Sequence, residues 1–111
     1  MATTFNFQRT EVYLAARDVA VRVHRLGIRD CELRDQATRA AKSCFLNLSE
    51  GLPSKMSGVR RRHFAIALGS LGEVCAALDL AHAIGAIDAS ADLDAALARL
   101  AALVGGLLRA A

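Results

Sequence analysis

The sequence predicts an all-α protein: an antiparallel, up-down-up-down four-helix bundle that forms a single domain over residues 1–111. Hydrophobic residues make up 54% of the chain but aromatic residues only 5%. The core must therefore be built mainly from Ala, Leu, Val and Ile, and the abundant Ala and Leu are strong helix formers. The chain has one Pro and eight Gly, fewer turn-forming residues than an all-β domain needs. Four segments with helical spacing of apolar residues, separated by short breaks, favour the bundle.

The first expected helix covers residues 10–26. Its apolar residues recur at intervals of three and four and form one face: Val12, Ala16, Val19, Val23 and Leu26. The second helix is expected to follow the capping residue Asp30 and to run to Glu50. Gly51 is suited to a left-handed helix terminus, and Pro53 cannot continue the helix.

The third helix is expected from the capping residue Ser57 to about Ile84, where Gly85 ends it. Its predicted inward stripe is His63, Ala67, Ser70, Val74, Ala77, Ala81 and Ile84. The fourth helix follows the capping residue Ser90, with acidic side chains in its first turn that favour the helix dipole. Its predicted core seam is Leu93, Leu97, Leu100, Val104 and Leu107.

Polar residues recur at helical spacing on the second and third helices, and we interpret them as a structural polar network. The predicted members are Gln36, Arg39, Ser43, Asn47, Glu50, His63, Ser70 and Glu73. In an antiparallel hairpin the expected neighbours are Glu50 with Arg60, Asn47 with His63, Arg39 with Ser70, and Gln36 with Glu73. Buried polar groups must be paired, so such a network selects one helix register. The alternative is a buried catalytic or ligand site.

Nothing in the sequence pairs a nucleophile with a base, so we expect no catalytic residues and no cofactor. A di-iron bundle needs two Glu-x-x-His motifs and two further Glu residues. This chain offers one Asp79-x-x-His82 together with Glu50 and Glu73, the second motif with a histidine is absent, and we expect no metal site. The three cysteines (Cys31, Cys44 and Cys75) are odd in number and far apart, which indicates reduced thiols.

The net charge of +3 conceals an asymmetry between the two halves of the chain. Residues 1–63 hold 12 Lys and Arg against 6 Asp and Glu, whereas residues 64–111 hold 2 against 5. A basic first half suits an anionic partner. The candidate nucleic-acid-binding residues are Arg22, Arg25, Arg29, Lys55, Arg60, Arg61 and Arg62. The cluster at residues 60–62 has no stacking aromatic pattern, so binding there would follow the phosphate backbone. The alternative is a solvated start of the third helix.

The fourth helix carries a second face of small residues that a monomer does not need. We predict these residues as a homo-oligomer interface: Ala95, Ala98, Ala102 and Gly105. The alternative is that this face packs inside the bundle beside the first helix. Residues 1–7 are polar and lack an apolar leader, and the longest apolar stretch carries Glu73, Asp79 and His82. We therefore expect a cytoplasmic protein without a membrane span.

Two motifs resemble a known family. QATRAAKS at residues 36–43 with NLSEG at residues 47–51, and IALGSLGE at residues 66–73, resemble the signatures of bacterial four-helix-bundle proteins encoded in 23S rRNA intervening sequences. Val12 and Tyr13 followed by Ala16 resemble the opening segment of that family. The chain departs from the family pattern in three places. The usual NIAEG reads NLSEG, the following turn contains Pro53 and Gly58, and three Arg residues are adjacent at residues 60–62.

The resemblance implies a four-helix bundle whose shared polar core is Gln36, Arg39, Ser43, Asn47, Glu50, Ser70 and Glu73. Related proteins include accessory proteins of diversity-generating retroelements, which form pentameric rings and associate with a reverse transcriptase and nucleic acid. Our leading hypothesis is accordingly a non-catalytic homo-oligomer, a pentamer, that binds RNA or DNA through Arg-bearing surfaces. The second hypothesis is a scaffold that binds a reverse transcriptase or another protein without nucleic-acid contact, and an enzyme is the third.

Overall fold

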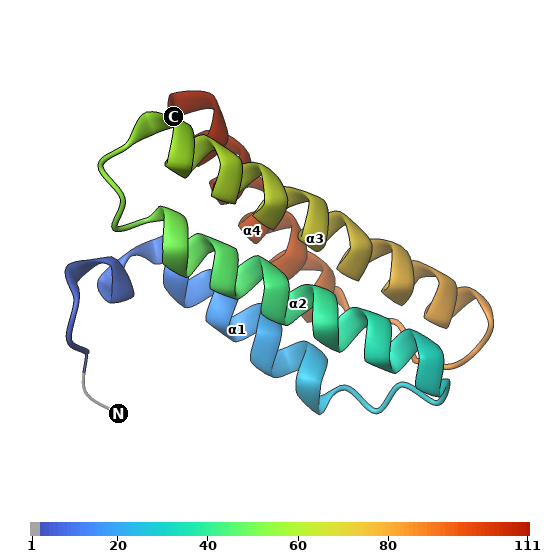
Figure 1. Ribbon diagram of the computed structural model, residues 1–111. Helices are drawn as coiled ribbons and strands as arrows, with labels where there is room; N and C mark the ends of the chain where they lie inside the picture. Colours follow the sequence, from blue (N-terminus) through green and yellow to red (C-terminus); the bar gives the residue numbers. More distant parts are fainter. Residues whose placement is uncertain (1–2) are drawn as a thin grey trace.

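The computed structural model describes residues 3–111, so Met1 and Ala2 of the N-terminal segment lie outside the described part. Its elements are the short 3-10 helix η1 (Asn6–Arg9) and the helices α1 (Glu11–Arg25), α2 (Cys31–Gly51), α3 (Ser57–Ala83) and α4 (Ala91–Ala110). No strand occurs in residues 3–111. Consecutive α-helices run in opposite directions and are joined at alternate ends (Figure 1). The predicted all-α four-helix bundle is confirmed.

Each helix packs chiefly against two neighbours, in the order α1, α2, α3, α4 and back to α1. The α2–α3 pair has the most extensive contact of the four. In this square arrangement the face formed by α1 and α2 lies on the opposite side of the bundle from the face formed by α3 and α4 (Figure 1). This opposition matters for the charged surfaces described below.

Side chains cap three of the four α-helices at their N-termini. The hydroxyl oxygen of Thr10, a carboxylate oxygen of Asp30 and the hydroxyl oxygen of Ser90 each accept a hydrogen bond from the backbone N–H three residues later, at 3.3, 3.0 and 3.2 Å. These bonds satisfy donors that a helix start leaves unpaired. The expected caps at Asp30 and Ser90 are therefore present. Helix α3 differs, because Ser57 is its first residue and Met56 at the N-cap position makes no side-chain bond.

The end of α2 differs from the prediction. The helix continues through Gly51, and Gly85 is the single residue of the described chain with a positive φ, at 78°. The left-handed terminus predicted at Gly51 is thus wrong. Gly51 is needed for space, because an added Cβ would lie 2.8 Å from Cε1 of Phe64. At Gly85 the positive φ ends α3 as expected, since glycine adopts it without a Cβ clash.

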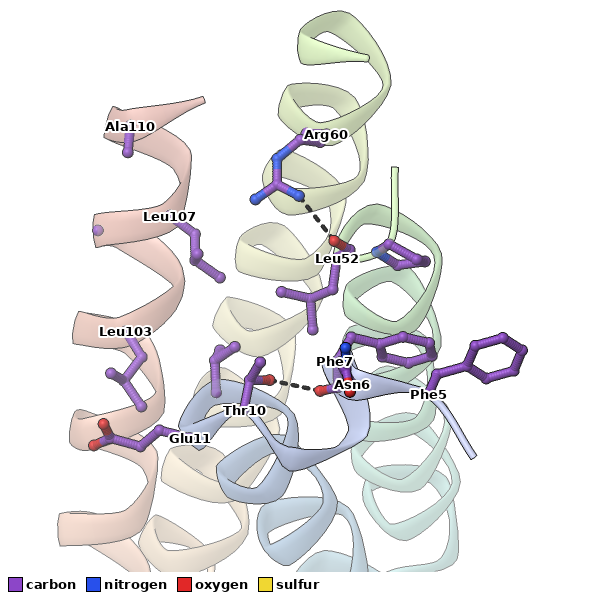
Figure 2. A pocket seen from close by; sticks show the side chains of 13 residues that line it. Phe5, Asn6, Phe7, Thr10, Glu11, Leu52, Arg60, Leu103, Leu107 and Ala110 are labelled. Atoms are coloured by element: carbon purple, nitrogen blue, oxygen red, sulfur yellow. Dashed lines mark hydrogen bonds between the residues drawn. The ribbon is translucent and has the colours of Figure 1, made fainter. Parts of the chain in front are cut away.

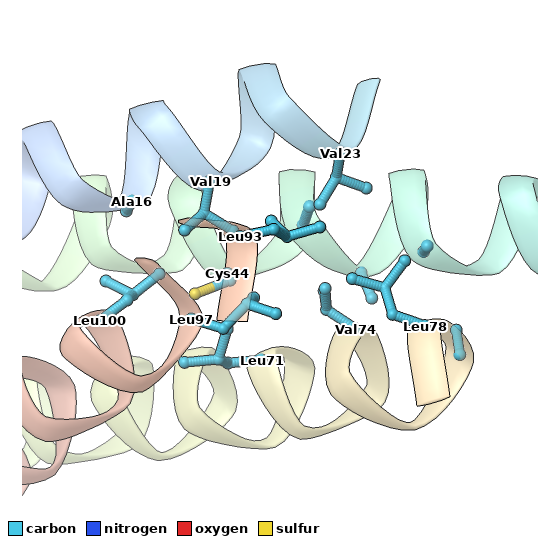
Figure 3. Close-up of a cluster of buried hydrophobic side chains, with 14 of the residues drawn as sticks. Ala16, Val19, Val23, Cys44, Leu71, Val74, Leu78, Leu93, Leu97 and Leu100 are labelled. Atoms are coloured by element: carbon cyan, nitrogen blue, oxygen red, sulfur yellow. The ribbon is translucent and has the colours of Figure 1, made fainter. Parts of the chain in front are cut away.

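All four helices contribute to one hydrophobic core (Figure 3). Its largest fully buried side chains are Val23, Leu48, Phe64, Leu71, Val74, Leu100 and Val104. The predicted faces of α1 and α4 are buried, except that Leu26 and Leu107 are only half-buried. The face predicted for α3 is partly wrong, since His63 is half-buried and Ile84 is 56% exposed. Phe64, Leu71 and Leu78 fill the core there instead.

Helix α3 is apolar on more than one side, which explains why the sequence did not predict its buried face correctly. By length and composition it could cross a membrane, but 44% of its most apolar window is buried inside the bundle. A helix whose apolar residues surround its axis has no single hydrophobic stripe from which the buried side can be identified. Helix α3 therefore fills the core with one side and exposes apolar residues on the other.

Candidate functional site

A short ladder of polar side chains joins α2 to α3. The Ser43 and Ser70 hydroxyl oxygens lie 2.9 Å apart and share a hydrogen bond. Asn47 Nδ2 donates to the backbone carbonyl of Ser43 at 2.9 Å, and His63 Nδ1 donates to Asn47 Oδ1 at 3.0 Å. His63 Nε2 lies 3.4 Å from Glu50 Oε2. We call Ser43, Asn47, Glu50, His63 and Ser70 the polar ladder.

The polar ladder is smaller than the predicted network. The expected contact between Asn47 and His63 is present. Other expected pairs are not, because Glu50 meets His63 instead of Arg60, and Ser70 meets Ser43 instead of Arg39. Within the described chain, the side chains of Gln36, Arg39 and Glu73 are exposed and make no hydrogen bond or ion pair, so their assignment to a network is wrong. These three residues lie on solvent-facing sides of their helices.

The geometry of the polar ladder suits a structural role. The two serine hydroxyls bond to each other, while His63 faces Asn47 and Glu50. Nucleophilic catalysis needs a hydroxyl within hydrogen-bond reach of its base, and the bonds of the ladder do not join either serine to the imidazole. Every buried side-chain nitrogen and oxygen of the described residues has a partner. The ladder therefore fixes the register of α2 against α3.

Exposed apolar side chains occur along α2 and α3, and two of them lie beside the polar ladder. Leu46, Ile66, Leu80 and Ile84 are 57%, 39%, 51% and 56% exposed. Leu46 follows Ser43 by three residues and Ile66 follows His63 by three, so helical spacing places both beside the ladder. We call Leu46 and Ile66 the α2–α3 apolar patch, whereas Leu80 and Ile84 lie about 21 Å or more further along the helix axis from Ile66. Sequence reasoning missed the patch, although the all-round apolar character of α3 indicated that it exposes such residues.

The small-residue face of α4 is turned to solvent. Ala95, Ala98 and Ala102 are exposed and Gly105 is half-buried, while Leu93, Leu97, Leu100 and Val104 face the core. The alternative that this face packs inside the bundle beside α1 is therefore wrong. The surface offered by α4 is smooth, since none of its three alanines extends beyond Cβ.

Arg60 acts within the fold. Its Nη1 donates hydrogen bonds to the backbone carbonyls of Gly51, Leu52 and Ser54 at 3.4, 2.9 and 3.1 Å. Its guanidinium carbon lies 5.0 Å from the centre of the Phe64 ring, which adds a cation–π contact. Figure 2 shows the side chain reaching the Leu52 carbonyl. The guanidinium holds the α2–α3 turn, so Nη1 of Arg60 is occupied within the fold.

Several other predicted cations have partners within the chain. Arg22 Nε lies 2.8 Å from Asp18 Oδ2. Arg29 Nη2 donates to the Gly85 carbonyl at 2.9 Å, and Arg61 Nη2 donates to the Ala111 carbonyl at 2.7 Å. The exposed side chains of Arg25, Lys55 and Arg62 make no ion pair or hydrogen bond among residues 3–111. The predicted cations therefore do not form one continuous surface.

A groove between α1 and α2 holds cations that sequence reasoning mostly missed. Its volume is about 470 Å³, and its lining residues are His24, Arg34, Asp35, Thr38, Arg39 and Lys42. We call it the α1–α2 cationic groove. Arg34, Thr38 and Lys42 follow one another at intervals of four, and that spacing predicts one cationic row on α2. The Arg run at residues 60–62 is denser in charge, so charge density alone favoured that run over the row on α2.

An acidic groove lies on the opposite face of the bundle. A groove of about 410 Å³ between α3 and α4 is lined by Asp79, Asp88 and Asp94 and by no Lys or Arg. Cys75 and His82 also line it. Burial, and secondarily the charge of Asp94, raise the pKa of the Cys75 thiol. Among the described residues, no three His, Cys, Asp or Glu side chains are grouped so that they could hold a metal ion.

A third groove is apolar and lies near the chain ends. It has a volume of about 770 Å³, and Phe5, Phe7, Leu52, Leu103 and Leu107 contribute to its walls (Figure 2). Phe7 packs edge-on against Tyr13 with the ring centres 5.7 Å apart. The aromatic residues of the N-terminal segment thereby cover part of the end of the bundle.

The model of the family described as 23S rRNA-intervening sequence protein matches residues 8–106. The chain belongs to the 23S rRNA-intervening sequence protein family. The resemblance based on the two motifs of α2 and α3 is thus confirmed. No curated protein matches the chain.

The part shared with the intervening-sequence family contains the main features described above. The polar ladder, the α2–α3 apolar patch and the α1–α2 cationic groove all lie within residues 8–106. Phe5, which lines the apolar groove, precedes the matched segment. Membership in this family supports a small helical protein and leaves its partner to be inferred from the surfaces.

Proposed function

We propose that this member of the intervening-sequence family is a non-catalytic subunit that assembles with copies of itself and binds RNA or another nucleic acid. The observation that carries the proposal is a separation of surfaces. The α2–α3 apolar patch lies on one face of the bundle, and the unpaired cations of the α1–α2 cationic groove lie on another. A chain organised in this way can bury the first surface against another copy and leave the second free for an anionic ligand.

The α2–α3 apolar patch supports self-assembly. Interface cores are rich in apolar side chains and poor in charge, and exposed apolar patches are typical of interaction sites. The small-residue face of α4 lies on another side of the bundle and allows another backbone to approach closely. Contact between the patch of one copy and the α4 face of the next is head-to-tail, and such contacts form a ring when the rotation between copies closes. A ring of five is the assembly that the family resemblance implies.

Nucleic-acid binding is supported by the distribution of charge. Of the 14 Lys and Arg residues, 12 lie in residues 1–63, and several of them are exposed without a partner in the described chain. Phosphate contacts of this kind supply most of the affinity of sequence-independent binding. The second candidate function, a scaffold for another protein, uses the α2–α3 apolar patch for that protein and the cations for solubility.

Light scattering tests the assembly. The wild-type protein should give a multiple of the 11.8 kDa monomer mass. Leu46→Glu combined with Ile66→Glu should give the monomer mass with unchanged helical content, because charge in the apolar contact opposes its burial. Leu14→Glu combined with Val21→Glu is the matched control, since both residues lie on α1, are 41% and 40% exposed, and lie outside the patch. A wild-type protein of monomer mass at tens of micromolar would refute self-assembly.

A salt series tests nucleic-acid binding. Fluorescence anisotropy with a labelled single-stranded RNA of about 20 nucleotides should show an affinity that falls linearly on logarithmic axes as salt rises. The absence of binding at about 50 mM salt would refute this part of the proposal. That result would favour the scaffold, whose partner would be a reverse transcriptase or another protein.

A further inference from the structure

We propose that the α1–α2 cationic groove is the principal site for the phosphate backbone of a single-stranded nucleic acid. The inference rests on the proposed function and deepens it, because it assigns the binding to one surface. That surface contains Arg34 and Lys42 and differs from the Arg run at residues 60–62. Three observations carry the assignment: the spacing of the cations, their lack of partners, and the charge on the opposite face.

The spacing of the cations suits a phosphate backbone. Arg34 and Lys42 lie two turns apart on α2 with Thr38 between them, so successive members of this row are separated by about 6 Å along the helix axis. Arg39 adds a guanidinium between the turns, and His24 of α1 lines the same groove. Neighbouring phosphates of an extended strand are separated by a comparable distance, so one strand can contact successive cations as it follows the helix.

The cations of the groove have no partners within the described chain. Arg34, Arg39 and Lys42 are exposed, and their side chains enter no hydrogen bond or ion pair among residues 3–111. Five other Arg residues bind carboxylates or backbone carbonyls: Arg22, Arg29, Arg60, Arg61 and Arg99. Arg25, Lys55 and Arg62 are also unpaired within the described chain, but they do not line this groove. An unpaired guanidinium retains its full set of donors for an external phosphate oxygen.

The opposite face of the bundle strengthens the preference for the groove. The acidic groove between α3 and α4 presents Asp79, Asp88 and Asp94, which repel a polyanion. The two grooves therefore differ in local charge, and a polyanion is favoured at the cationic one. The α3–α4 groove is therefore excluded as the site of the strand, and the α1–α2 cationic groove is not.

The composition of the groove also defines the kind of recognition. Its lining contains no Phe, Tyr or Trp side chain, and bases stack most strongly on such rings. Contacts to phosphates position a strand without reading its sequence. Binding should therefore tolerate any base sequence. Asp35 is the single acidic residue of the lining, and its charge opposes a bound phosphate.

Two triple variants with the same change in charge test the site. The first, Arg34→Gln with Arg39→Gln and Lys42→Gln, removes the cations of the groove. The second, Lys55→Gln with Arg61→Gln and Arg62→Gln, removes the same charge at the other end of the bundle. With a labelled single-stranded oligouridylate of about 20 nucleotides, the groove variant should lose about tenfold or more in affinity at low salt. Its salt slope should fall by about 2, at roughly 0.7 for each lost contact. The second variant should change affinity by less than about threefold.

Asp35→Asn gives a test of opposite sign in the same groove. Removing the negative charge should raise affinity by about two- to threefold, because the repulsion of the bound phosphate is lost. Circular dichroism and thermal unfolding of every variant confirm that the bundle is retained. Equal losses in the two triple variants, or an Asp35→Asn protein with unchanged affinity, would overturn the assignment.

Two further outcomes of the binding experiments distinguish failure of the proposed function from failure of the groove assignment. If the wild-type protein fails to bind at low salt, the proposed function fails before the groove is considered. If the groove variant dissociates into monomers while each chain still binds RNA with wild-type affinity, the groove is a contact between copies, and the inference is overturned although the proposed function stands.

Discussion

His63 and Asn47 join α3 to α2 through a hydrogen bond that fixes the orientation of both side chains. The Asn47 carboxamide donates through Nδ2 to the Ser43 carbonyl and accepts through Oδ1 from His63 Nδ1. An amide oxygen can only accept, so the proton of this bond belongs to Nδ1 of His63. The other ring nitrogen then faces the Glu50 carboxylate at 3.4 Å. Asn47 is consequently the central member of the polar ladder.

Asn47→Ala should lower the free energy of unfolding by about 1–3 kcal/mol, because it leaves the half-buried Nδ1–H of His63 without its acceptor. Urea unfolding monitored by circular dichroism measures the change. Gln36→Ala is the control on the same helix, since Gln36 is exposed and has no hydrogen-bond partner in the described chain. Its effect should stay within about 0.5 kcal/mol. Equal effects of the two variants would show that the ladder adds no stability.

Arg60→Gln should destabilise the protein by about 1–3 kcal/mol, because three backbone carbonyls of the α2–α3 turn lose a charged donor. Arg60→Lys should restore only part of the loss, since an ammonium cannot reproduce the planar guanidinium over the Phe64 ring. The midpoint of urea unfolding gives the comparison. Arg62→Gln, at an exposed position two residues later, should leave the midpoint nearly unchanged. An equal shift of the unfolding midpoint in Arg62→Gln would mean that positive charge near the start of α3 stabilises the protein and the hydrogen bonds of Arg60 to the turn do not.

The sequence predicted those parts of the fold that depend on local signals. Asp30 and Ser90 cap their helices because a short polar side chain before an amphipathic run can accept a backbone N–H. Val12, Ala16, Val19 and Val23 are buried because α1 has one apolar stripe. Local patterns also identified Asn47 and His63 as neighbours, since antiparallel hairpins follow simple pairing rules.

The remaining features depend on tertiary contacts that no local pattern contains. Ile84 is exposed because α3 is apolar on several sides, and only packing against α2 and α4 determines which side is buried. Gly51 is required by the Phe64 ring, which lies 13 residues further along the chain. Arg60 was assigned to a ligand surface because its carbonyl partners become visible only when the turn has a defined path. The groove that Arg34 and Lys42 line needs His24 of another helix.

Gly51→Ala and Gly72→Ala should change stability in opposite directions. At Gly51 the new Cβ would lie 2.8 Å from Cε1 of Phe64, and the overpacked core should lose about 1–3 kcal/mol. At Gly72 no atom lies within 4 Å of the added Cβ, so the higher helix propensity of alanine should add about 1 kcal/mol. Thermal unfolding of the two variants measures both changes. A Gly51→Ala protein as stable as the wild type would show that the Phe64 ring moves aside at little cost.

Burial of Cys44 makes the stability of the bundle depend on alkaline pH. The thiol lies in the core among side chains from the other helices (Figure 3). Burial, with a smaller contribution from Cys75, raises its pKa from 9.0 to about 12. Between these two values the unfolded chain releases the thiol proton and the folded chain keeps it. Stability from this group is therefore complete below pH 9.0 and is lost as the pH rises toward 12.

The expected slope is a loss of about 1.4 kcal/mol per pH unit for one such proton. Lys and Tyr side chains also titrate at alkaline pH, so the comparison is with Cys44→Ala, which lacks only this thiol. Urea unfolding from about pH 8 to about pH 11 should show the wild type losing stability faster than the variant. The difference between the two proteins should be constant at the lower end and shrink above pH 9.0. A difference that stays constant over the whole range would mean that water reaches the Cys44 thiolate in the folded protein, and the core around it would then be more open than its packing indicates.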